Sequence, residues 1–248
     1  MRSALTAVAA FLAIWSGALS GAETGKRPLR LGFGTDKPPY IFEAERRGLE
    51  YDIVVEAAER AGFAVSTSFA PLSRLHSMLA HHELDGIATT NSRAQAAACY
   101  SKPYIDYHNV AIALTARHLP IASITDLANY SVSSFQRSRD LLGPEYTRMA
   151  EANPHYREEA NQISRNTLLY SGRVDVIVGD QRILAYFNHV VADKVDVTQP
   201  VTVYELFAPI SYSVGFSDPA LCAPFDAGLD ALRRSGDYAR IEERYRDY

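Results

Sequence analysis

Apolar positions in the first half of the chain alternate between the spacing of strands and the spacing of helices. Three short apolar or alternating runs predict strands, at Leu29–Thr35, Ala64–Phe69 and Asp85–Ala88. Two amphipathic runs between them predict helices, one over Gly48–Gly62 and one that begins at Pro71. A longer apolar run over Tyr107–Thr115 predicts a further strand. This order is typical of an α/β unit with a mostly parallel sheet.

The second half repeats this alternation. Strands are predicted at Tyr130–Phe135, Val174–Val178, Val195–Val203 and Ile210–Phe216. Helices are predicted at Ser138–Met149, Asn161–Gly172, Asp180–Val191, Pro219–Ser235 and Asp237–Tyr245. No Gly/Ser-rich linker separates the halves, so we expect two α/β lobes, each a mixed sheet flanked by helices, with a cleft between them. Ligands of such sheets bind beyond the carboxyl ends of strands.

The N-terminal segment does not follow the globular pattern. A basic start at Met1–Arg2 precedes an uncharged apolar run, Ala4–Trp15, and a small-residue stretch, Ser16–Ala22. These features predict a secretory signal peptide, residues 1–22, and a periplasmic protein. The alternative is a membrane anchor, but the apolar run falls short of the ~20 residues that span a bilayer.

Composition narrows the class of function. The 248 residues are 47% hydrophobic and carry a formal charge of −4, which excludes a disordered chain and gives no basic surplus for nucleic acid. The two cysteines, Cys99 and Cys222, are either one disulfide or two buried thiols. His81-His82-Glu83 is interpreted as a solvated helix end and not as a metal site, because adjacent helical residues do not face one another. No nucleophile elbow, P-loop or dinucleotide motif occurs, so no enzyme, cofactor or metal is predicted.

Four segments in register resemble the bacterial extracellular solute-binding proteins of family 3, the polar amino acid receptors of ABC importers. They are Gly34–Tyr40 with Gly48–Asp52, Leu84–Arg93 with Tyr100–Tyr104, Gly172–Asp180, and Tyr212–Phe216 with Leu229–Tyr245. The resemblance implies a type II periplasmic-binding fold. Lobe 1 would hold residues 23–110 and 209–248, lobe 2 would hold residues 111–208, and two crossover strands would act as hinges. Both cysteines would then lie in lobe 1.

The resemblance also implies a site for an amino acid between the lobes. Arg93 would bind the α-carboxylate bidentately, with Thr90 completing that site. Asp180, at the carboxyl end of a buried strand, would bind the α-ammonium group. From the residues alone, Arg93 also fits a surface arginine paired with an acid. Asp180 also fits the cap of the helix that follows it, a role that is compatible with ligand binding.

Further residues would shape the pocket. Tyr40 and Tyr51 would wall it, although both also fit a core position, and Asp36 would read a polar or cationic side chain. The family's usual Gly-Thr pair reads Arg137-Ser138 here. Ser138 would begin a helix whose amides face the ligand, while Arg137 would crowd the pocket or bind an anionic ligand group.

The implied function is capture of a small polar solute, an amino acid or a related compound, by a monomer that delivers it to an ABC permease of the inner membrane. Two alternatives share the fold. One is a sensory or accessory binding protein without its own importer. The other is a periplasmic enzyme resembling cyclohexadienyl dehydratase, in which Asp36, Asp180 or Glu205 would act as the acid or base.

Overall fold

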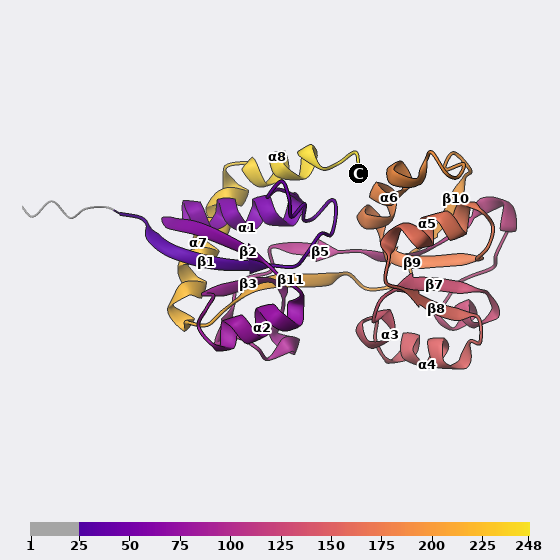
Figure 1. Cartoon of the computed structure of the whole chain (residues 1–248), viewed down its shortest axis with the longest axis horizontal. Helices are drawn as coiled ribbons and strands as arrows, with labels where there is room; N and C mark the ends of the chain where they lie inside the picture. Colours follow the sequence, from indigo (N-terminus) through magenta and orange to yellow (C-terminus); the bar gives the residue numbers. More distant parts are fainter. Residues whose placement is uncertain (1–24) are drawn as a thin grey trace, which may run out of the picture.

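The computed structural model describes residues 25–248, so the predicted signal peptide, residues 1–22, lies outside the described part of the chain. Two lobes lie side by side, each built on its own sheet (Figure 1). The first sheet has six strands, in the order β2-β1-β3-β11-β4 with β5 paired to β11, and the second has five, in the order β10-β6-β9-β7-β8. The predicted two-lobed α/β fold with mixed sheets is confirmed.

Lobe 1 combines the start and the end of the described chain. Its strands are β1 (Arg27–Phe33), β2 (Phe63–Phe69), β3 (Gly86–Thr90), β4 (Cys99–Tyr100), β5 (Ile105–Tyr107) and β11 (Ile210–Phe216). Its helices are α1 (Leu49–Arg60), α2 (Leu72–Ala80), α7 (Cys222–Arg234) and α8 (Asp237–Arg244). Strands β1, β2 and β3 are parallel, while β11 runs antiparallel to β3. Helices α1, α7 and α8 cover one face and α2 the other (Figure 1).

Lobe 2 is built from the middle of the chain. Its strands are β6 (Asn109–Leu114), β7 (Val132–Phe135), β8 (Tyr156–Glu159), β9 (Val176–Asp180) and β10 (Val201–Tyr204). Its helices are α3 (Ser138–Leu141), α4 (Pro144–Ala152), α5 (Gln162–Tyr170) and α6 (Gln181–Val191). Every residue of β9 is buried, as expected for a central strand covered on both faces.

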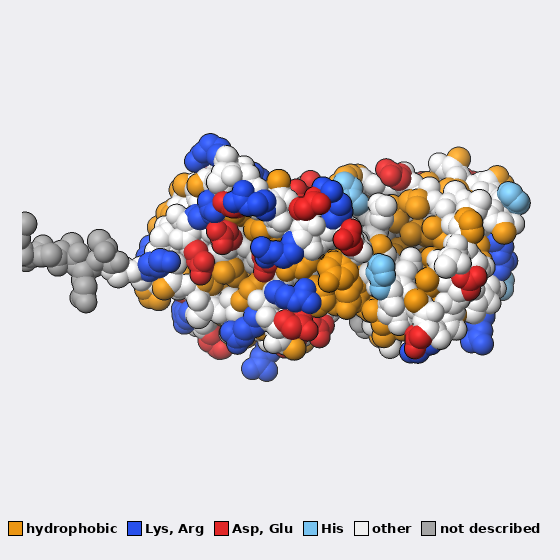
Figure 2. Space-filling model, turned by 90° about the horizontal axis from the view of Figure 1, so that it is seen from above, with side chains coloured by type: hydrophobic (Ala, Val, Ile, Leu, Met, Phe, Trp, Pro, Cys, Tyr) orange, Lys and Arg blue, Asp and Glu red, His pale blue; other side chains and the backbone are white. Residues whose placement is uncertain are grey.

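The chain crosses between the lobes twice. The first crossing is at His108, between β5 and β6, and the second is the segment 205–209 between β10 and β11. The lobes also touch away from the crossings, because Ile183 and Phe187 of α6 pack into the apolar core of lobe 1. Hydrophobic side chains are visible where the two lobes meet, whereas charged side chains gather on the lobe 1 surface (Figure 2).

Several predicted elements were wrong in extent. The predicted strand 107–115 is broken at His108, where β5 ends and the chain crosses to β6 of lobe 2. The predicted helix 138–149 is two helices, α3 and α4, because Gly143 adopts a positive φ of 94° and Pro144 cannot continue a helix. The predicted strand 195–203 is paired only from Val201, because Thr198 donates its backbone N–H to the Asp196 side chain, 3.0 Å away, and closes a turn. Strand β8 was not predicted, since its Tyr-Arg-Glu-Glu sequence is polar.

The C-terminal helices are fixed to the first sheet by a disulfide and by close helix packing. Cys99 of β4 and Cys222 of α7 form a disulfide with an S–S distance of 2.05 Å. Helix α7 packs on α1 so closely that a Cβ added to Gly228 would lie 2.1 Å from the carbonyl oxygen of Ala57. Between residues 25 and 248, no helix is long and apolar enough to cross a membrane, and no cluster of His, Cys, Asp and Glu could hold a metal ion.

Gly228→Ala should destabilise the protein, because the new methyl group meets backbone that cannot move aside. We expect a loss of about 1–3 kcal/mol in the free energy of unfolding, measured by chemical denaturation. Gly34→Ala is the matched control, since a Cβ there meets no atom within 4 Å. Equal stability of the two variants would contradict this packing.

Candidate ligand-binding site

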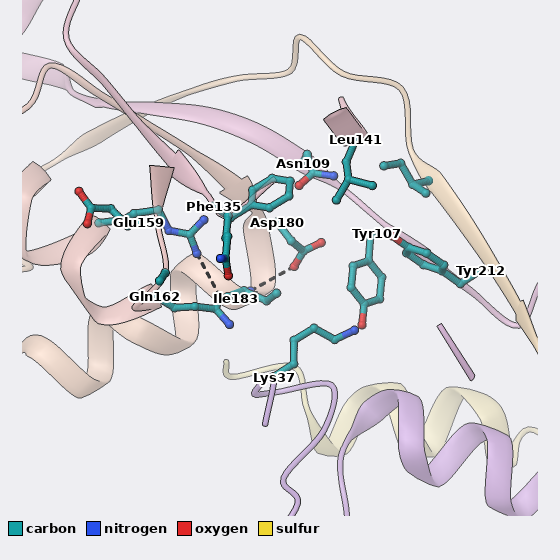
Figure 3. Close-up of a pocket in the computed structure, with 14 residues that line it drawn as sticks. Lys37, Tyr107, Asn109, Phe135, Leu141, Glu159, Gln162, Asp180, Ile183 and Tyr212 are labelled. Carbon is teal, nitrogen blue, oxygen red and sulfur yellow. Dashed lines mark hydrogen bonds between the residues drawn. The ribbon is translucent and has the colours of Figure 1, made fainter. Parts of the chain in front are cut away.

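A cavity of about 270 Å³ lies between the two lobes (Figure 3). Its volume lies just below the ~300–1,000 Å³ range of small-molecule pockets, which suits a small solute. The residues that line it come from both lobes and from the crossings: Lys37, Tyr107, Asn109, Phe135, Gln136, Leu141, Glu159, Ala160, Gln162, Arg165, Asp180, Ile183, Ile210 and Tyr212. Four of them are charged residue types, two basic (Lys37, Arg165) and two acidic (Glu159, Asp180). The cavity therefore suits a small ligand with polar or charged groups.

The lobe 1 side of the cavity rests on a buried carboxylate, Glu50 of α1. Glu50 accepts hydrogen bonds from the hydroxyls of Thr89, Tyr104 and Tyr107, the last at 2.6 Å, and it pairs with the Lys37 ammonium at 3.4 Å. Burial by itself raises the pKa of Glu50, but Lys37 and the three hydroxyl donors outweigh burial and hold the pKa below its ordinary value. Lys37 also lies 4.7 Å from the centre of the Tyr107 ring. This network fixes Lys37 and Tyr107 at the wall of the cavity.

The lobe 2 side presents Asp180, whose carboxylate is the N-cap of α6. It accepts hydrogen bonds from the backbone N–H groups of Arg182 and Ile183, at 3.0 and 3.1 Å, and from that of His108, at 2.9 Å. The hydroxyl of Tyr40 donates across the lobe boundary, 3.0 Å from Oδ1 of Asp180. Burial raises the pKa of Asp180 despite these donors. Asp180 thus caps a helix, contacts lobe 1 and faces the cavity at once.

Arg165 of α5 is a second charged group on the lobe 2 side. The side chain is 1% exposed, and its Nη1 and Nη2 donate to the Val178 carbonyl and the Gln162 side chain, at 3.1 and 3.0 Å. Its guanidinium lies 5.9 Å from the centre of the Phe135 ring. Burial lowers the pKa of Arg165 to about 10, so the group stays protonated at neutral pH.

Two of the eight candidate residues from the sequence come together in the structure. Tyr40 and Asp180 are hydrogen-bonded, and the Tyr40 ring stacks on Tyr107 at a centroid distance of 4.0 Å. Asp36 lies in a neighbouring hollow of about 720 Å³ between the lobes, where its Oδ1 accepts the Glu43 N–H at 2.7 Å.

The carboxylate candidates of lobe 1 lie outside the cavity. Thr90 is buried at the end of β3, and its hydroxyl has no hydrogen-bond partner among the described residues. Arg93 is exposed in the short 3-10 turn Ser92–Ala94 and lines an adjoining groove of about 410 Å³, which shares Ile210 with the cavity. Tyr51, the second aromatic candidate, also lies outside the cavity. Its ring packs on Phe33 and Phe69, and its hydroxyl shares a hydrogen bond with the Thr67 hydroxyl. It lines a different hollow, together with residues of α8.

The Arg137-Ser138 pair also lies outside the cavity lining. The Arg137 side chain is 73% exposed and pairs with Asp140, while its backbone N–H donates to Glu158 at 2.7 Å. The Ser138 hydroxyl is buried, 2.8 Å from that of Tyr156. Helix α3, which Ser138 begins, is only four residues long.

Four charged residues of the site escaped the sequence analysis: Lys37, Glu50, Glu159 and Arg165. A signal for Arg165 was present, because it lies one helical turn before Leu169 on the buried face of α5. Glu50 similarly precedes the buried pair Ile53 and Val54 by one turn. In both cases the helical spacing indicated a buried position, whereas the charged residue type indicated an exposed one.

These features, two α/β lobes around a cavity lined with charged and aromatic side chains, define a solute-binding architecture. The chain belongs to the bacterial extracellular solute-binding proteins, family 3, which its residues 29–247 match. No curated protein matches the sequence of the chain.

Solved structures share the fold at low sequence identity. The arginine-, lysine-, histidine-binding protein ArtJ from Geobacillus stearothermophilus is 18% identical, with a TM-score of 0.65 over 88% of this chain and 95% of ArtJ. The GluR0 ligand-binding core in complex with L-glutamate is 21% identical, with a TM-score of 0.66 over 88% of this chain and 97% of that one. A histidine kinase sensor domain similar to periplasmic binding proteins is 21% identical, with a TM-score of 0.68 over 89% and 96%.

Glu50→Gln should lower the free energy of unfolding at neutral pH by about 1–3 kcal/mol. Both carboxylate oxygens of Glu50 face hydrogen-bond donors, so the N–H₂ group of glutamine would replace an acceptor by a donor. The folded-state pKa of Glu50 is depressed, so its stabilisation is present above the ordinary value of 4.5 and is lost as the pH falls through the folded-state value. The gap in unfolding free energy between wild type and variant should therefore shrink with acidification. The other titratable groups are present in both proteins, so the pH dependence of this gap reports on Glu50.

The measurement is urea denaturation at a series of pH values, with the exposed Glu83→Gln as control. A gap that stays constant from about pH 7 to about pH 3 would show that Glu50 has no depressed pKa.

Proposed function

We propose that this protein is a periplasmic receptor that captures a small polar solute, an amino acid or a related compound, and delivers it to an ABC permease of the inner membrane. The observation that carries the proposal is the cavity between the lobes, to which each lobe contributes charged side chains. Membership of the extracellular solute-binding proteins, family 3, supports it. The amino acid ligands in the names of ArtJ and of the GluR0 complex agree with such a ligand.

Within this proposal, Asp180 receives the cationic group of the solute. Its carboxylate is desolvated, and attraction to an ammonium group is stronger in a low-dielectric site than in water. Tyr107, Tyr212 and Phe135 supply aromatic faces around the cavity. Such faces favour the apolar part of a solute or a cationic group.

Binding would act by closing the lobes. The chain crosses between them at His108 and at residues 205–209, so a rigid rotation about these two segments leaves both sheets intact. A ligand that contacts both lobes stabilises the closed state by its differential affinity for that state. The closed monomer would then dock on the permease, without any chemical step.

A sensory role for the same binding event is the second candidate. The fold match to a histidine kinase sensor domain favours it, because the same architecture there belongs to a receptor. The two roles differ in the partner that reads the closed state, and they predict the same behaviour of the isolated protein toward its ligand.

A thermal-shift assay with a panel of amino acids, dicarboxylates and amines should give at least one ligand. A ligand at about 100 times its Kd adds about 2.7 kcal/mol to the stability of the folded state, which corresponds to a rise of about 5–10 °C in Tm for a chain of this size. If neither this panel nor a broad set of polar metabolites shifts the Tm, the solute-receptor proposal fails.

Asp180→Asn should weaken the binding of amine-containing ligands from that panel at least about tenfold. Asparagine remains a good helix N-cap, so the variant removes the charge and keeps the start of α6. Asp193→Asn, on the exposed end that follows α6, is the control for loss of one negative charge. Unchanged affinity in Asp180→Asn would rule out Asp180 as the ammonium site.

A further inference from the structure

Arg165 is a buried cation with unused hydrogen-bond donors. A guanidinium carries five N–H groups. Two hydrogen bonds engage Nη1 and Nη2, and Nε has no partner among the described residues. Because an unpaired buried donor costs about 1–3 kcal/mol, such a group calls for an explanation.

The other charges of the cavity wall are compensated. Lys37 pairs with Glu50 at 3.4 Å, and the Glu159 carboxylate lies 3.0 Å from Nε of Arg157. Asp180 accepts hydrogen bonds from four donor groups within the protein. In contrast, no carboxylate of residues 25–248 lies within ion-pair distance of Arg165. Among the described residues, Asp180 and Arg165 are the two charged groups of the cavity wall without an ion-pair partner. Of these two, only Arg165 also keeps an unpaired polar atom, its Nε–H.

The guanidinium of Arg165 is also held in position. It lies over Gly179 of β9, where an added Cβ would come within 2.9 Å of Nη1, so the absence of a side chain at residue 179 makes room for it. Gln162 and the Val178 carbonyl fix its two terminal nitrogens. Gly179 directly precedes Asp180 on β9. The Arg165 guanidinium and the Asp180 carboxylate therefore meet the same end of this strand, and both residues line the cavity.

We propose that Arg165 binds a carboxylate group of the ligand, and that the ligand is a small carboxylic acid or amino acid whose acidic group is read by lobe 2. This inference rests on the proposed solute-binding function. A carboxylate supplies the charge and the planar pair of acceptors that a guanidinium matches, and it removes the cost of the uncompensated charge. The exposed Arg93 of lobe 1 would then lie outside the carboxylate site.

The test compares acids with their neutral amides. Isothermal titration measures the affinities of L-glutamate, L-glutamine and L-isoglutamine, and of succinate, succinamate and succinamide, alongside any further acid found in the thermal-shift panel. In the wild type, amidation of the carboxylate that Arg165 binds should weaken binding about 10- to 100-fold. Arg165→Gln should weaken binding of the acid by the same factor and leave the corresponding amide unaffected, so that the preference for the acid disappears.

A second variant, Gly179→Ala, tests the position of the Arg165 side chain without removing it. Gly179→Ala forces the flexible end of Arg165 to move while its charge remains, so it should reduce the preference for the acid without loss of folding, as checked by circular dichroism. Arg173→Gln, an exposed arginine of lobe 2, is the matched control and should bind as the wild type does.

The outcomes separate the inference from the function on which it rests. A preference for the acid that persists in both Arg165→Gln and Gly179→Ala, or that is lost only in Arg93→Gln, overturns the assignment of Arg165. Ligands that bind the wild type without any carboxylate also overturn it, while the solute-receptor function stands. If no compound binds the wild type, the proposed function itself is contradicted, and the inference falls with it.

Discussion

The carboxylate of Asp180 is the point at which both lobes and one chain crossing meet. It caps α6 in lobe 2, accepts the His108 N–H at the crossing and accepts the Tyr40 hydroxyl from lobe 1. A buried carboxylate costs free energy unless hydrogen-bond donors surround it. Moving any one of these donors away from Asp180 would therefore leave the carboxylate less well satisfied. The positions of α6, the crossing and the loop that carries Tyr40 are therefore coupled. A cationic group bound at Asp180 would change the hydrogen bonding of all three. Binding at one carboxylate would in this way change the position of one lobe relative to the other.

The two lobes treat their buried charges differently. Lobe 1 neutralises its own, since Glu50 is surrounded by three hydroxyls and by Lys37. Lobe 2 leaves Arg165 without an ion-pair partner among residues 25–248, in the wall of the same cavity that Asp180 lines. Charge that a fold buries without compensation costs stability, and proteins retain it where a ligand completes the site. We infer that the ligand contributes the missing negative group, and that lobe 1 contributes mainly a rigid aromatic and cationic wall.

The order of strands and helices was predictable because apolar periodicity is local. The strand Ile210–Phe216 has the bounds expected from its sequence, and Asp180 was recognised at the end of a buried strand. The contact between Tyr40 and Asp180 joins residues 140 positions apart, so no local pattern encodes it. Arg165 was missed because a polar residue on a helix is usually solvated. Its burial depends on the space that Gly179 of strand β9 leaves, which the sequence around Arg165 does not encode. The exposure of Arg93 follows from the path of the loop after β3, which neither spacing nor residue type determines.

The central claim is that one small solute occupies the cavity between the lobes. Native mass spectrometry tests it most directly, on the intact protein incubated with a protein-free extract of small polar metabolites. We predict a single non-covalent adduct of low mass, at one copy per chain, that is lost on denaturation and whose released compound carries a carboxylate. The absence of any adduct from the whole extract, under conditions where the fold is intact, would contradict the claim.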